Sequence, residues 1–308
     1  MRIFITGANG LVGTELVRLC LKGGHEVFSG YTAGELPAGV PIRIDLTDAA
    51  SLSLAFERSR PEAVFHLAAK TDVDRCEVEK KLASSINEGG TQVVAALAKK
   101  AGARLVLNST DYVFPGDRGP YREEDTPLPV NHYGYTKLMA EEAVAESGVE
   151  YMIARSSAVY GTHPAFGETN FALWAYETLK EKEKVVLCTD QFVSPTLNTS
   201  LAAMLLEACE RGLTGIYHLS GATRVSRHGF GLRLAEVFGL DRGLVRPGLM
   251  EDFHGRWVAK RPPDSSLDTS KAAAALRAKP LSLDQALAEF KKEMGWREKC
   301  LRIQDPLG

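Results

Sequence analysis

Two tyrosines and one lysine stand close together in the segment NHYGYTK, residues 131–137. Tyr133 precedes Lys137 by four residues, and Tyr135 precedes it by two. On a helix, positions i and i+4 share a face, whereas positions i and i+2 point apart. Tyr133 can therefore meet Lys137, and Tyr135 cannot. A packed aromatic ring beside a solvated lysine is the plainer interpretation of so short a motif, so its meaning depends on the rest of the chain.

A phenol beside an ammonium group is an arrangement suited to proton transfer. Tyrosine ordinarily has a pKa near ~10, and lowering it by ~3 units requires about 4 kcal/mol of preference for the anion. One ammonium group at ~4 Å supplies about that much at an effective dielectric constant near ~20. We therefore expect Lys137 to lower the pKa of Tyr133 and to make its hydroxyl an acid–base catalyst.

Hydroxyl groups also close an apolar stretch upstream, in the segment LNSTDYVFPG at residues 107–116. Ser109 and Thr110 follow the apolar residues directly, so they would stand at the carboxyl edge of a sheet, where α/β proteins bind ligands. Turns select the same residue types, so the segment by itself leaves both interpretations open.

Three glycines near the N-terminus have a spacing typical of a dinucleotide-binding turn. Gly7, Gly10 and Gly13 in TGANGLVG follow an apolar run directly and precede an amphipathic helical pattern. Glycine permits positive φ, close approach of the backbone to a pyrophosphate and tight packing of the helix, whose free N–H groups then face the phosphates. A tight turn without a ligand is the alternative.

The end of the second expected strand bears on which cofactor is bound. The segment VFSGYTAG, residues 27–34, contains no carboxylate before Glu35, and no arginine stands beside Ser29. A carboxylate at this position would accept a hydrogen bond from the ribose 2′-OH of NAD, and an arginine would bind a 2′-phosphate. An NAD-only site is therefore disfavoured, and we predict NADPH, with NADH possible.

Short β-branched or aromatic runs alternate with segments of helical spacing in the first half of the chain. The expected strands are residues 2–6, 25–29, 41–45, 62–68, 103–109 and 150–157, and the expected helices are residues 11–23, 48–59, 89–102 and 133–148. Parallel strands need crossover helices, so this alternation predicts an α/β fold with a Rossmann-like, doubly wound parallel sheet. Ligands of such a sheet bind beyond the carboxyl ends of its strands.

The pattern loosens after Ser156. The expected helices there are residues 170–183, 199–212 and 281–294, and the expected strands are residues 184–190 and 215–221. We expect an NAD(P)-binding Rossmann domain over residues 1–155, rejoined by about residues 185–212, with at least one strand returned to its sheet. Residues 156–308 would form mainly a smaller substrate-binding α/β cap facing the cofactor cleft.

Composition excludes several functional classes. The 308 residues are 44% apolar and 25% charged, with a formal charge of −2, so no nucleic-acid surface is indicated. The five cysteines are scattered and lack any C-x-x-C pair, so we expect neither a disulfide framework nor a metal site. No apolar window approaches the ~20 residues of a membrane span, and no signal peptide is recognisable. We expect a cytoplasmic protein without membrane partners, and a homodimer is possible.

The pattern T-G-x-x-G-x-x-G, taken with a Ser/Thr–Tyr–Lys set, resembles the extended short-chain dehydrogenase/reductase family. The resemblance implies that Thr110 hydrogen-bonds a substrate carbonyl oxygen while Tyr133 gives the proton, as hydride arrives from the nicotinamide. Lys137 would also reach the ribose of the cofactor. These three residues are the predicted catalytic set.

The same resemblance implies further contacts to the cofactor. The predicted cofactor-binding residues are Gly7, Asn9, Gly10, Leu11, Val12, Asp45, Leu46, Ala68, Ala69, Lys70, Asn87, Tyr133 and Lys137. Ordinary structure explains some of them equally well. Asp45 could cap a helix together with Asp48, residues 68–70 could form a simple strand-exit loop, and Asn87 could cap a helix.

Seven blocks in order along most of the chain resemble the dTDP-4-dehydrorhamnose reductase family. They are STDYVFPG, YGYTKLMAEEA, ARSSAVYG, NF at residues 170–171, DQFVSPT, YHLSG and RPPDSSLDTSK. The resemblance implies NADPH-dependent reduction of the 4-keto group of a dTDP-4-keto-6-deoxy sugar, which yields dTDP-L-rhamnose for cell-surface polysaccharide. The predicted partner molecule is therefore a nucleotide sugar.

Six positions are predicted to contact that substrate: Asp111, Tyr112, Val113, Asn170, Gln191 and Arg261. The guanidinium group of Arg261 could offer a bidentate fork to a diphosphate. A surface salt bridge is the alternative for this arginine.

The sequence departs from the family pattern at one position and matches a second relative elsewhere. Ala158 stands where the family usually has tryptophan, which removes a large contact surface beside the sugar. The segment PYREEDTPLPVNHYG, residues 120–134, also resembles the regulatory β subunit of methionine adenosyltransferase, so a cofactor-binding regulatory subunit is an alternative. An epimerase or dehydratase is disfavoured because Asp111 is followed by Tyr112 and not by glutamate.

Overall fold

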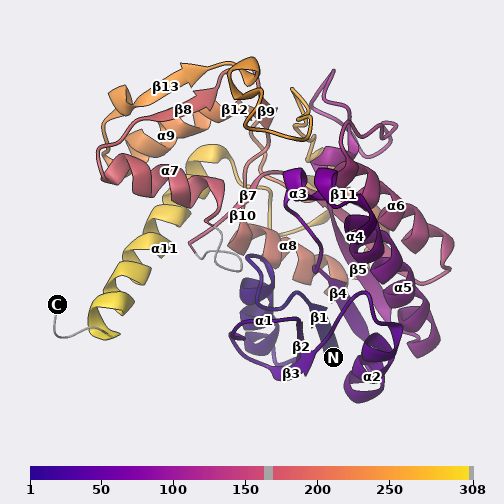
Figure 1. Ribbon diagram of the computed structural model, residues 1–308. Coiled ribbons are helices and arrows are strands. Elements are labelled where there is room, and N and C mark those ends of the chain that lie inside the picture. The colour runs from indigo at the N-terminus through magenta and orange to yellow at the C-terminus, as the bar shows by residue number, and fades with distance from the viewer. Residues whose placement is uncertain (163–168, 305–308) are drawn as a thin grey trace.

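The computed structural model describes residues 1–162 and 169–304. Its centre is a parallel sheet of seven strands in the order β11-β6-β5-β4-β1-β2-β3 (Figure 1). The strands are β1 (Arg2–Thr6), β2 (Glu26–Tyr31), β3 (Val40–Arg43), β4 (Ala63–His66), β5 (Arg104–Thr110), β6 (Tyr151–Ser156) and β11 (Gly215–His218). The chain winds outward from β1 in both directions, which confirms the predicted doubly wound α/β fold.

Helices link successive strands and cover both faces of this sheet. They are α1 (Gly13–Lys22), α2 (Ala49–Ser59), α3 (Val73–Val78), α4 (Lys80–Ser84), the π-helical turn η1 (Ser85–Gly89), α5 (Gly90–Ala101), the 3-10 turn η2 (Asp111–Val113) and α6 (His132–Glu146). Side chains alternate along β1, so that Ile3 and Ile5 pack in the cluster with α1 while Phe4 packs edge-on against Phe56 of α2. Both faces of the strands are therefore buried, which explains why they read as continuous apolar runs.

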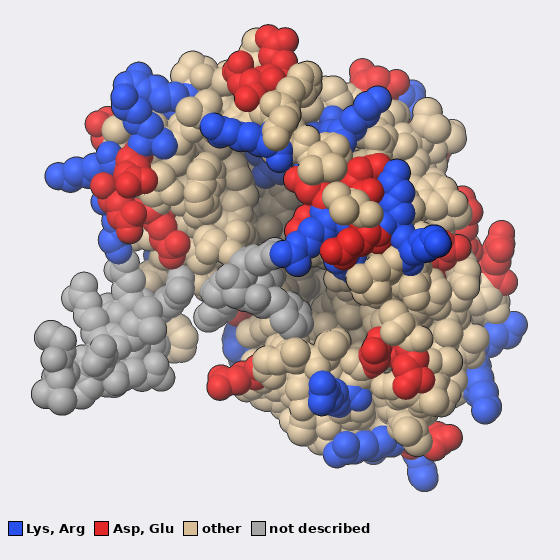
Figure 2. Space-filling model, viewed as in Figure 1, with Lys and Arg blue, Asp and Glu red and all other residues tan. Residues whose placement is uncertain are grey.

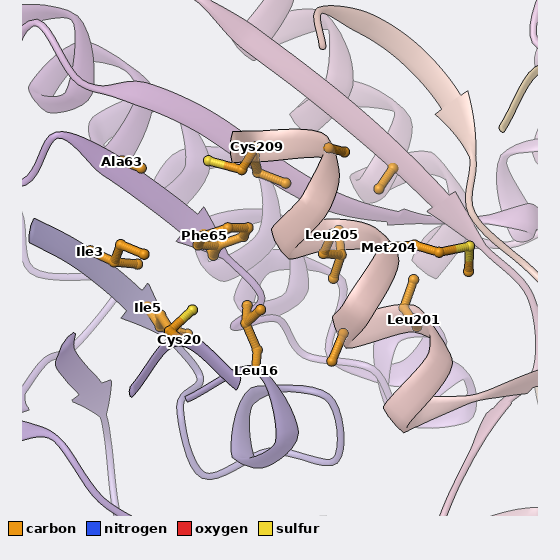
Figure 3. Close-up of a cluster of buried hydrophobic side chains, with 14 of the residues drawn as sticks. Ile3, Ile5, Leu16, Cys20, Ala63, Phe65, Leu201, Met204, Leu205 and Cys209 are labelled. Atoms are coloured by element: carbon orange, nitrogen blue, oxygen red, sulfur yellow. The ribbon is translucent and has the colours of Figure 1, made fainter. Parts of the chain in front are cut away.

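One face of the sheet is completed by the C-terminal half of the chain. Helix α8 (Asn198–Glu210) lies beside α1, and its Leu201 and Leu205 point into the cluster formed by Ile5, Phe65 and Leu16 (Figure 3). The strand β11 follows α8 and pairs with β6 at the sheet edge. This face of the sheet is thus fully covered only when residues from beyond position 197 fold onto it.

Within the predicted rejoining segment, residues 185–212, helix α8 packs on the sheet but β8 (Val185–Cys188) does not join it. The returning strand is β11, while β8 pairs in parallel with β13 (Val245–Gly248) outside the main sheet. Parallel strands need a crossover helix, and α9 (Arg227–Phe238) supplies it by packing Ala235 against Leu187 and Val245. The division into two domains stays a prediction.

Helix α10 (Ser270–Ala275) packs Ala272 into the same cluster of the main sheet as α8. The other remaining elements form the region predicted as the cap. They are β7 (Val159–Tyr160), α7 (Phe171–Lys180), β9 (Phe192–Val193), β10 (Thr196–Leu197), β12 (Val225–Ser226), η3 (Arg242–Leu244), η4 (Met250–Phe253) and α11 (Leu283–Gln304). Aromatic rings hold its core together, since Tyr160 meets Phe230 of α9 and Phe290 of α11 edge-on at 5.4 Å in each case.

The carboxyl ends of the central strands lie at one edge of the sheet. The parallel register sets Thr6 of β1 level with His66 of β4, and Thr110 of β5 level with Ser156 of β6. Polar residues that end these strands in the sequence therefore meet in space. Across the described ranges, no helix has both the length and the apolar character needed to cross a membrane.

Candidate active site

The glycine turn after β1 is shaped by two close approaches. Gly7 has φ +69°, and a Cβ there would lie 2.9 Å from the backbone nitrogen of Ala68. A Cβ on Gly13 would collide with the carbonyl oxygen of Gly7. Any larger residue at either position would therefore disrupt the turn that leads into α1. The cradle left by these glycines lines a cleft together with Gly10, Leu11 and Val12.

Asn9 holds the far side of the same turn. Its Nδ2 donates to the carbonyl oxygen of Ala33 at 2.7 Å, which ties the glycine turn to the loop after β2. Its Oδ1 is buried and has no hydrogen-bond partner among the described residues. A buried polar atom without a partner is costly, so a donor supplied by a bound cofactor fits this position.

A buried chain of hydrogen bonds links the glycine strand to η1. The hydroxyl of Thr6 accepts from the backbone nitrogens of Leu67 and Ala68 at 3.2 Å each and lies 2.7 Å from His66 Nδ1. Thr91 Oγ1 donates to the Asn87 carbonyl, and His66 Nε2 lies 3.0 Å from the same hydroxyl. Burial, and secondarily the charge of Lys137, lowers the pKa of His66 to about 3, so its imidazole is neutral.

Asn87 fixes the loop that follows β4. Its Oδ1 accepts from the backbone nitrogen of Lys70 at 2.8 Å, and its Nδ2 donates to the Lys70 carbonyl at 3.0 Å and to Thr136 Oγ1 at 2.9 Å. Asn87 lies inside η1 and so does not act as a helix cap. It holds Ala68, Ala69 and Lys70 at the cleft and joins them to α6.

Asp45 and Asp48 have separate roles. Asp48 caps α2 by accepting from the backbone nitrogen of Ala50 at 2.9 Å. Asp45 accepts from the hydroxyl and the backbone nitrogen of Thr47, and these hydrogen bonds, the hydroxyl first, hold the pKa of the Asp45 carboxyl below its ordinary value. Asp45 and Leu46 both line the cleft, as the cofactor prediction requires.

Helix α6 is positioned by its first turn. Asn131 caps the helix by accepting from the backbone nitrogen of Gly134 at 2.8 Å. A Cβ on Gly134 would collide with the carbonyl oxygen of Tyr112, so glycine is what lets the helix approach η2. This approach sets the ring of Tyr133 6.0 Å from the ring of Tyr112, at 69°.

The two tyrosines of NHYGYTK point in different directions. Tyr133 lines the cleft. Tyr135 is 45% exposed, and its ring stacks on that of His132 at 5.7 Å. This geometry agrees with the helical spacing, which placed Tyr133 and not Tyr135 on the face of Lys137.

Lys137 is buried beneath Tyr133 on the same helix. Its Nζ donates to the carbonyl oxygen of Asn108 at 2.8 Å, and its side chain is almost fully enclosed. Burial lowers the pKa of Lys137 to about 8, and the charge of Glu141 opposes that change. Glu141 itself forms a buried ion pair with Arg155 at 2.6 Å and accepts from Ser109 Oγ at 2.5 Å. Ser109 and Thr110 both line the cleft, but the Ser109 hydroxyl is committed to this ion pair.

The pKa of Tyr133 moves opposite to the expected direction. Burial raises it above the ordinary value, and a hydrogen bond with Thr110 opposes the rise. The expectation that Lys137 would lower it rested on Coulomb attraction alone. Loss of hydration penalises the phenolate more strongly, and the ammonium group is directed at the Asn108 carbonyl.

Asp111 follows Thr110 and is buried among hydroxyl groups. Its carboxylate accepts from Ser157 Oγ at 2.8 Å, from Ser265 Oγ at 2.5 Å and from Thr110 Oγ1 at 3.1 Å. Burial raises the pKa of this carboxyl, and the hydroxyls oppose the rise. The predicted substrate residue Asp111 therefore also orients the hydroxyl of Thr110.

These elements enclose one cleft of about 640 Å³ between the sheet edge and the cap. Figure 2 shows the surface hollowed near the centre of this face, with charged residues of both signs around the hollow. The residues that line the cleft include Gly7, Gly10, Leu11, Val12, Asp45, Leu46, Ala68, Ala69, Lys70, Thr110, Asp111, Tyr112 and Tyr133, together with Tyr31, Ala158 and Arg227. Most of the predicted cofactor residues and the catalytic hydroxyls are thus brought together.

The other predicted substrate residues are distributed differently. Tyr112, Gln191 and Arg261 line a second cavity of about 300 Å³ inside the cap. Val113 is fully buried in a cluster with Phe114, and Asn170 caps α7 and donates to the Gly161 carbonyl at 2.8 Å. Val113 therefore contributes to buried packing, and Asn170 contributes to helix capping.

A family model described as RmlD substrate binding domain matches residues 1–295. The chain belongs to this family. The probable low-salt glycan biosynthesis reductase Agl14 of Haloferax volcanii is 34% identical over 294 residues, which are 94% of this chain and 96% of that protein. Methionine adenosyltransferase 2 subunit beta of Xenopus laevis is 29% identical over 278 residues, 88% of this chain and 81% of that protein.

A solved member of the same family has a closely similar fold. The crystal structure of dTDP-4-dehydrorhamnose reductase from Bacillus anthracis, in complex with NADP, has a TM-score of 0.86 at 30% identity and covers 95% of this chain and 99% of that chain. The resemblance inferred from the sequence blocks is confirmed at the level of the family. This member of the RmlD family is therefore an oxidoreductase.

Two residues at the site were missed by the sequence analysis. Arg227, the first residue of α9, lines both cavities, and Asp74 of α3 accepts two hydrogen bonds from Arg261 at 2.9 and 3.1 Å. In the structure Ser226 caps α9 directly before Arg227, and a cap of this kind marks a helix start and not a site.

Proposed function

We propose that this oxidoreductase uses NADPH to reduce the 4-keto group of a dTDP-4-keto-6-deoxy sugar. The observation that carries the proposal is the cleft opened by the glycine turn, which Thr110 and Tyr133 line, with Lys137 buried one helical turn beyond Tyr133. The named relatives support a nucleotide-sugar reductase, and the seven sequence blocks support the choice of sugar.

The residues at the cleft fit a nicotinamide dinucleotide. Gly7 and Gly13 leave the space where a pyrophosphate can approach the backbone, and Asn9 offers a buried acceptor that has no donor among the described residues. The strand β2 ends at Tyr31, and Tyr31 and Thr32 line the cleft where a carboxylate would select NAD. NADPH is therefore favoured, and NADH remains possible. When bound, the nicotinamide supplies the hydride.

The side chains of Tyr133, Thr110 and Lys137 then carry out the proton transfer. Because the pKa of Tyr133 is raised, its phenol is protonated at neutral pH and can donate to the oxygen that develops negative charge. Thr110 is placed to hydrogen-bond the same oxygen, because it lines the same cleft as Tyr133. Lys137, with its pKa at about 8, is mostly protonated at neutral pH and stabilises the tyrosinate that remains.

The test is NADPH oxidation, followed by absorbance, with dTDP-4-keto-6-deoxy-L-mannose as substrate. Tyr133→Phe removes the proton donor, and we expect kcat to fall by about 10²- to 10⁴-fold. Tyr135→Phe is the matched control, because it removes the same hydroxyl two residues away on an exposed face. Absence of turnover in the unaltered protein, or full activity of Tyr133→Phe, would remove the proposal.

A cofactor-binding regulatory subunit is the second candidate. Two observations favour it: the likeness to methionine adenosyltransferase 2 subunit beta, and alanine at position 158, which has φ +42° in the cleft wall. It predicts a stable complex with a partner enzyme and no turnover. Turnover that depends on Tyr133, without any co-purifying enzyme, eliminates it.

A further inference from the structure

The cleft and the cap cavity meet at two shared residues. Tyr112 and Arg227 line both, whereas the other lining residues belong to one or the other. A substrate that fills both spaces must therefore pass between these two side chains. Under the proposed function, the sugar lies beside Tyr133 in the cleft, and the remainder of the nucleotide extends into the cap.

The cap cavity has the walls that a flat base requires. Phe171, Trp174, Phe253 and Trp257 contribute aromatic rings to it. Phe253 and Trp257 stack on each other at 5.0 Å and 15°, so they present a rigid planar wall. Aromatic faces of this kind bind planar rings through dispersion and burial. If the base and the sugar occupy opposite cavities, the diphosphate between them lies where the cavities meet.

Aromatic and backbone contacts hold Arg227 at that junction. Its guanidinium lies 4.6 Å above the ring of Phe171, and its backbone nitrogen donates to the Gln191 carbonyl at 3.0 Å. Burial raises the pKa of the Asp111 carboxyl in the same cleft, and the charge of Arg227 is among the effects that oppose the rise. None of the ion pairs found within the described part of the chain involves Arg227. A half-buried guanidinium oriented by an aromatic ring retains charge and donors for an anion.

Arg261, the sequence-based choice for the diphosphate, already has its charge paired with the carboxylate of Asp74 at 2.9 Å. Its two terminal nitrogens bind both carboxylate oxygens of Asp74, and one of them also donates to the Ala259 carbonyl at 3.0 Å. Asp74 additionally accepts from the backbone nitrogens of Val258 and Ala259. This network fixes the segment that carries Trp257, so Arg261 builds the wall of the cavity.

We propose that Arg227 binds the diphosphate of the nucleotide-sugar substrate at the junction of the two cavities, with the base among the aromatic residues of the cap. This inference rests on the proposed function for the identity of the substrate. The chemistry that it assigns to the site is the recognition of a nucleoside diphosphate, which can be measured without any turnover.

The experiment compares binding of dTDP and of thymidine to the purified protein by calorimetry. Arg227→Gln should weaken dTDP binding by about ten- to a hundredfold, because charged hydrogen bonds to the phosphates are lost, while thymidine binding should change little. Arg224→Gln is the matched control. Arg224 lies three residues away, 3.8 Å above the ring of Phe192, and is paired with Asp264 at 2.8 Å outside both cavities. Thermal melting of both variants verifies that they fold.

The outcomes separate this inference from the proposed function. If the unaltered protein binds dTDP through Arg227 but never oxidises NADPH, the diphosphate site stands and the reduction falls. If turnover occurs but Arg227→Gln binds dTDP as well as the unaltered protein does, the assignment to Arg227 is wrong. Equal weakening of dTDP and thymidine, or no binding of dTDP by the unaltered protein, also overturns it.

Discussion

Lys137 combines burial with a hydrogen bond that leaves its charge only partly balanced. The ammonium group donates to Asn108, the neutral ring of His66 lies on one side, and Glu141 lies one helical turn away. Glu141 shares its charge with Arg155 in a buried pair. The amine therefore loses hydration without gaining a full counter-charge, which is why its pKa falls to about 8.

The pH dependence follows from that pKa. Under the proposed mechanism we expect kcat/KM to fall as pH rises through about 8, because the Lys137 ammonium to which the proposal assigns stabilisation of tyrosinate loses its proton. The folded pKa of Lys137 lies below its ordinary value of 10.5, so between these values the unfolded chain binds more protons and stability rises with pH. Urea titrations at pH 8 and 10.5 should show that Lys137→Met flattens this rise. A rise that is unchanged in the variant would contradict the assignment.

At the scale of elements, the approach of α6 to η2 sets the geometry of the proton donor. Gly134 permits that approach, because a Cβ at this position would collide with the carbonyl oxygen of Tyr112. Asn131 holds the helix start from within, and its Nδ2 also donates to the carbonyl oxygen of Lys260 in the cap at 2.8 Å. The first turn of one helix thus connects the sheet, the cleft and the cap.

Gly134→Ala tests this contact between elements. The added Cβ must push α6 away from η2, so we expect kcat to fall at least tenfold, because reacting groups misplaced by ~1 Å can cost about 10²-fold in rate. Gly295→Ala is the matched control, since Gly295 lies in α11 with open space around its Cβ position. That change should leave activity intact and stabilise the helix by about 0.5–1 kcal/mol. An unaltered kcat in Gly134→Ala would show that the contact between α6 and η2 does not control the position of the proton donor.

At the scale of the whole molecule, the two halves of the chain share one core. Helix α8 and strand β11 come from the C-terminal half. Helix α8 covers the sheet of the N-terminal half (Figure 3), and β11 extends it by pairing with β6. Asp74 and Arg261 join the halves a second time at the mouth of the cap cavity. We therefore expect the chain to unfold as a single unit despite its length.

Leu205→Ala tests that expectation. Leu205 is fully buried between α8 and the sheet, so its truncation should lower the free energy of unfolding by about 2–5 kcal/mol. Leu54→Ala, at a position 66% exposed, should change it by less than about 0.5 kcal/mol. Chemical denaturation followed by circular dichroism and by tryptophan fluorescence should give coincident curves for each variant. Two separate transitions, with one shifted alone, would show that the cap folds independently.

Some features of the site were predictable because their signals are short-range. The glycine turn, the strand-end hydroxyl of Thr110 and the shared face of Tyr133 and Lys137 each follow from spacing within a few residues. The roles of Arg227 and Arg261 were not predictable in this way. Arg261 meets Asp74 across 187 positions of sequence, and this partner decides whether its guanidinium group is available to a ligand.

By itself, the sequence determined the alternation of strands and helices, the carboxyl edge at which polar residues gather, and that Tyr133 and Tyr135 point in different directions. Periodicity and turn chemistry depend on residues that are close in sequence, so they can be recognised from the sequence alone. Only the tertiary structure decided that Tyr133 has a raised pKa, that β11 rejoins the sheet, and that Arg227 stands where two cavities meet. Burial and distant partners set these properties, because hydration is lost and charges are paired only when remote segments pack together.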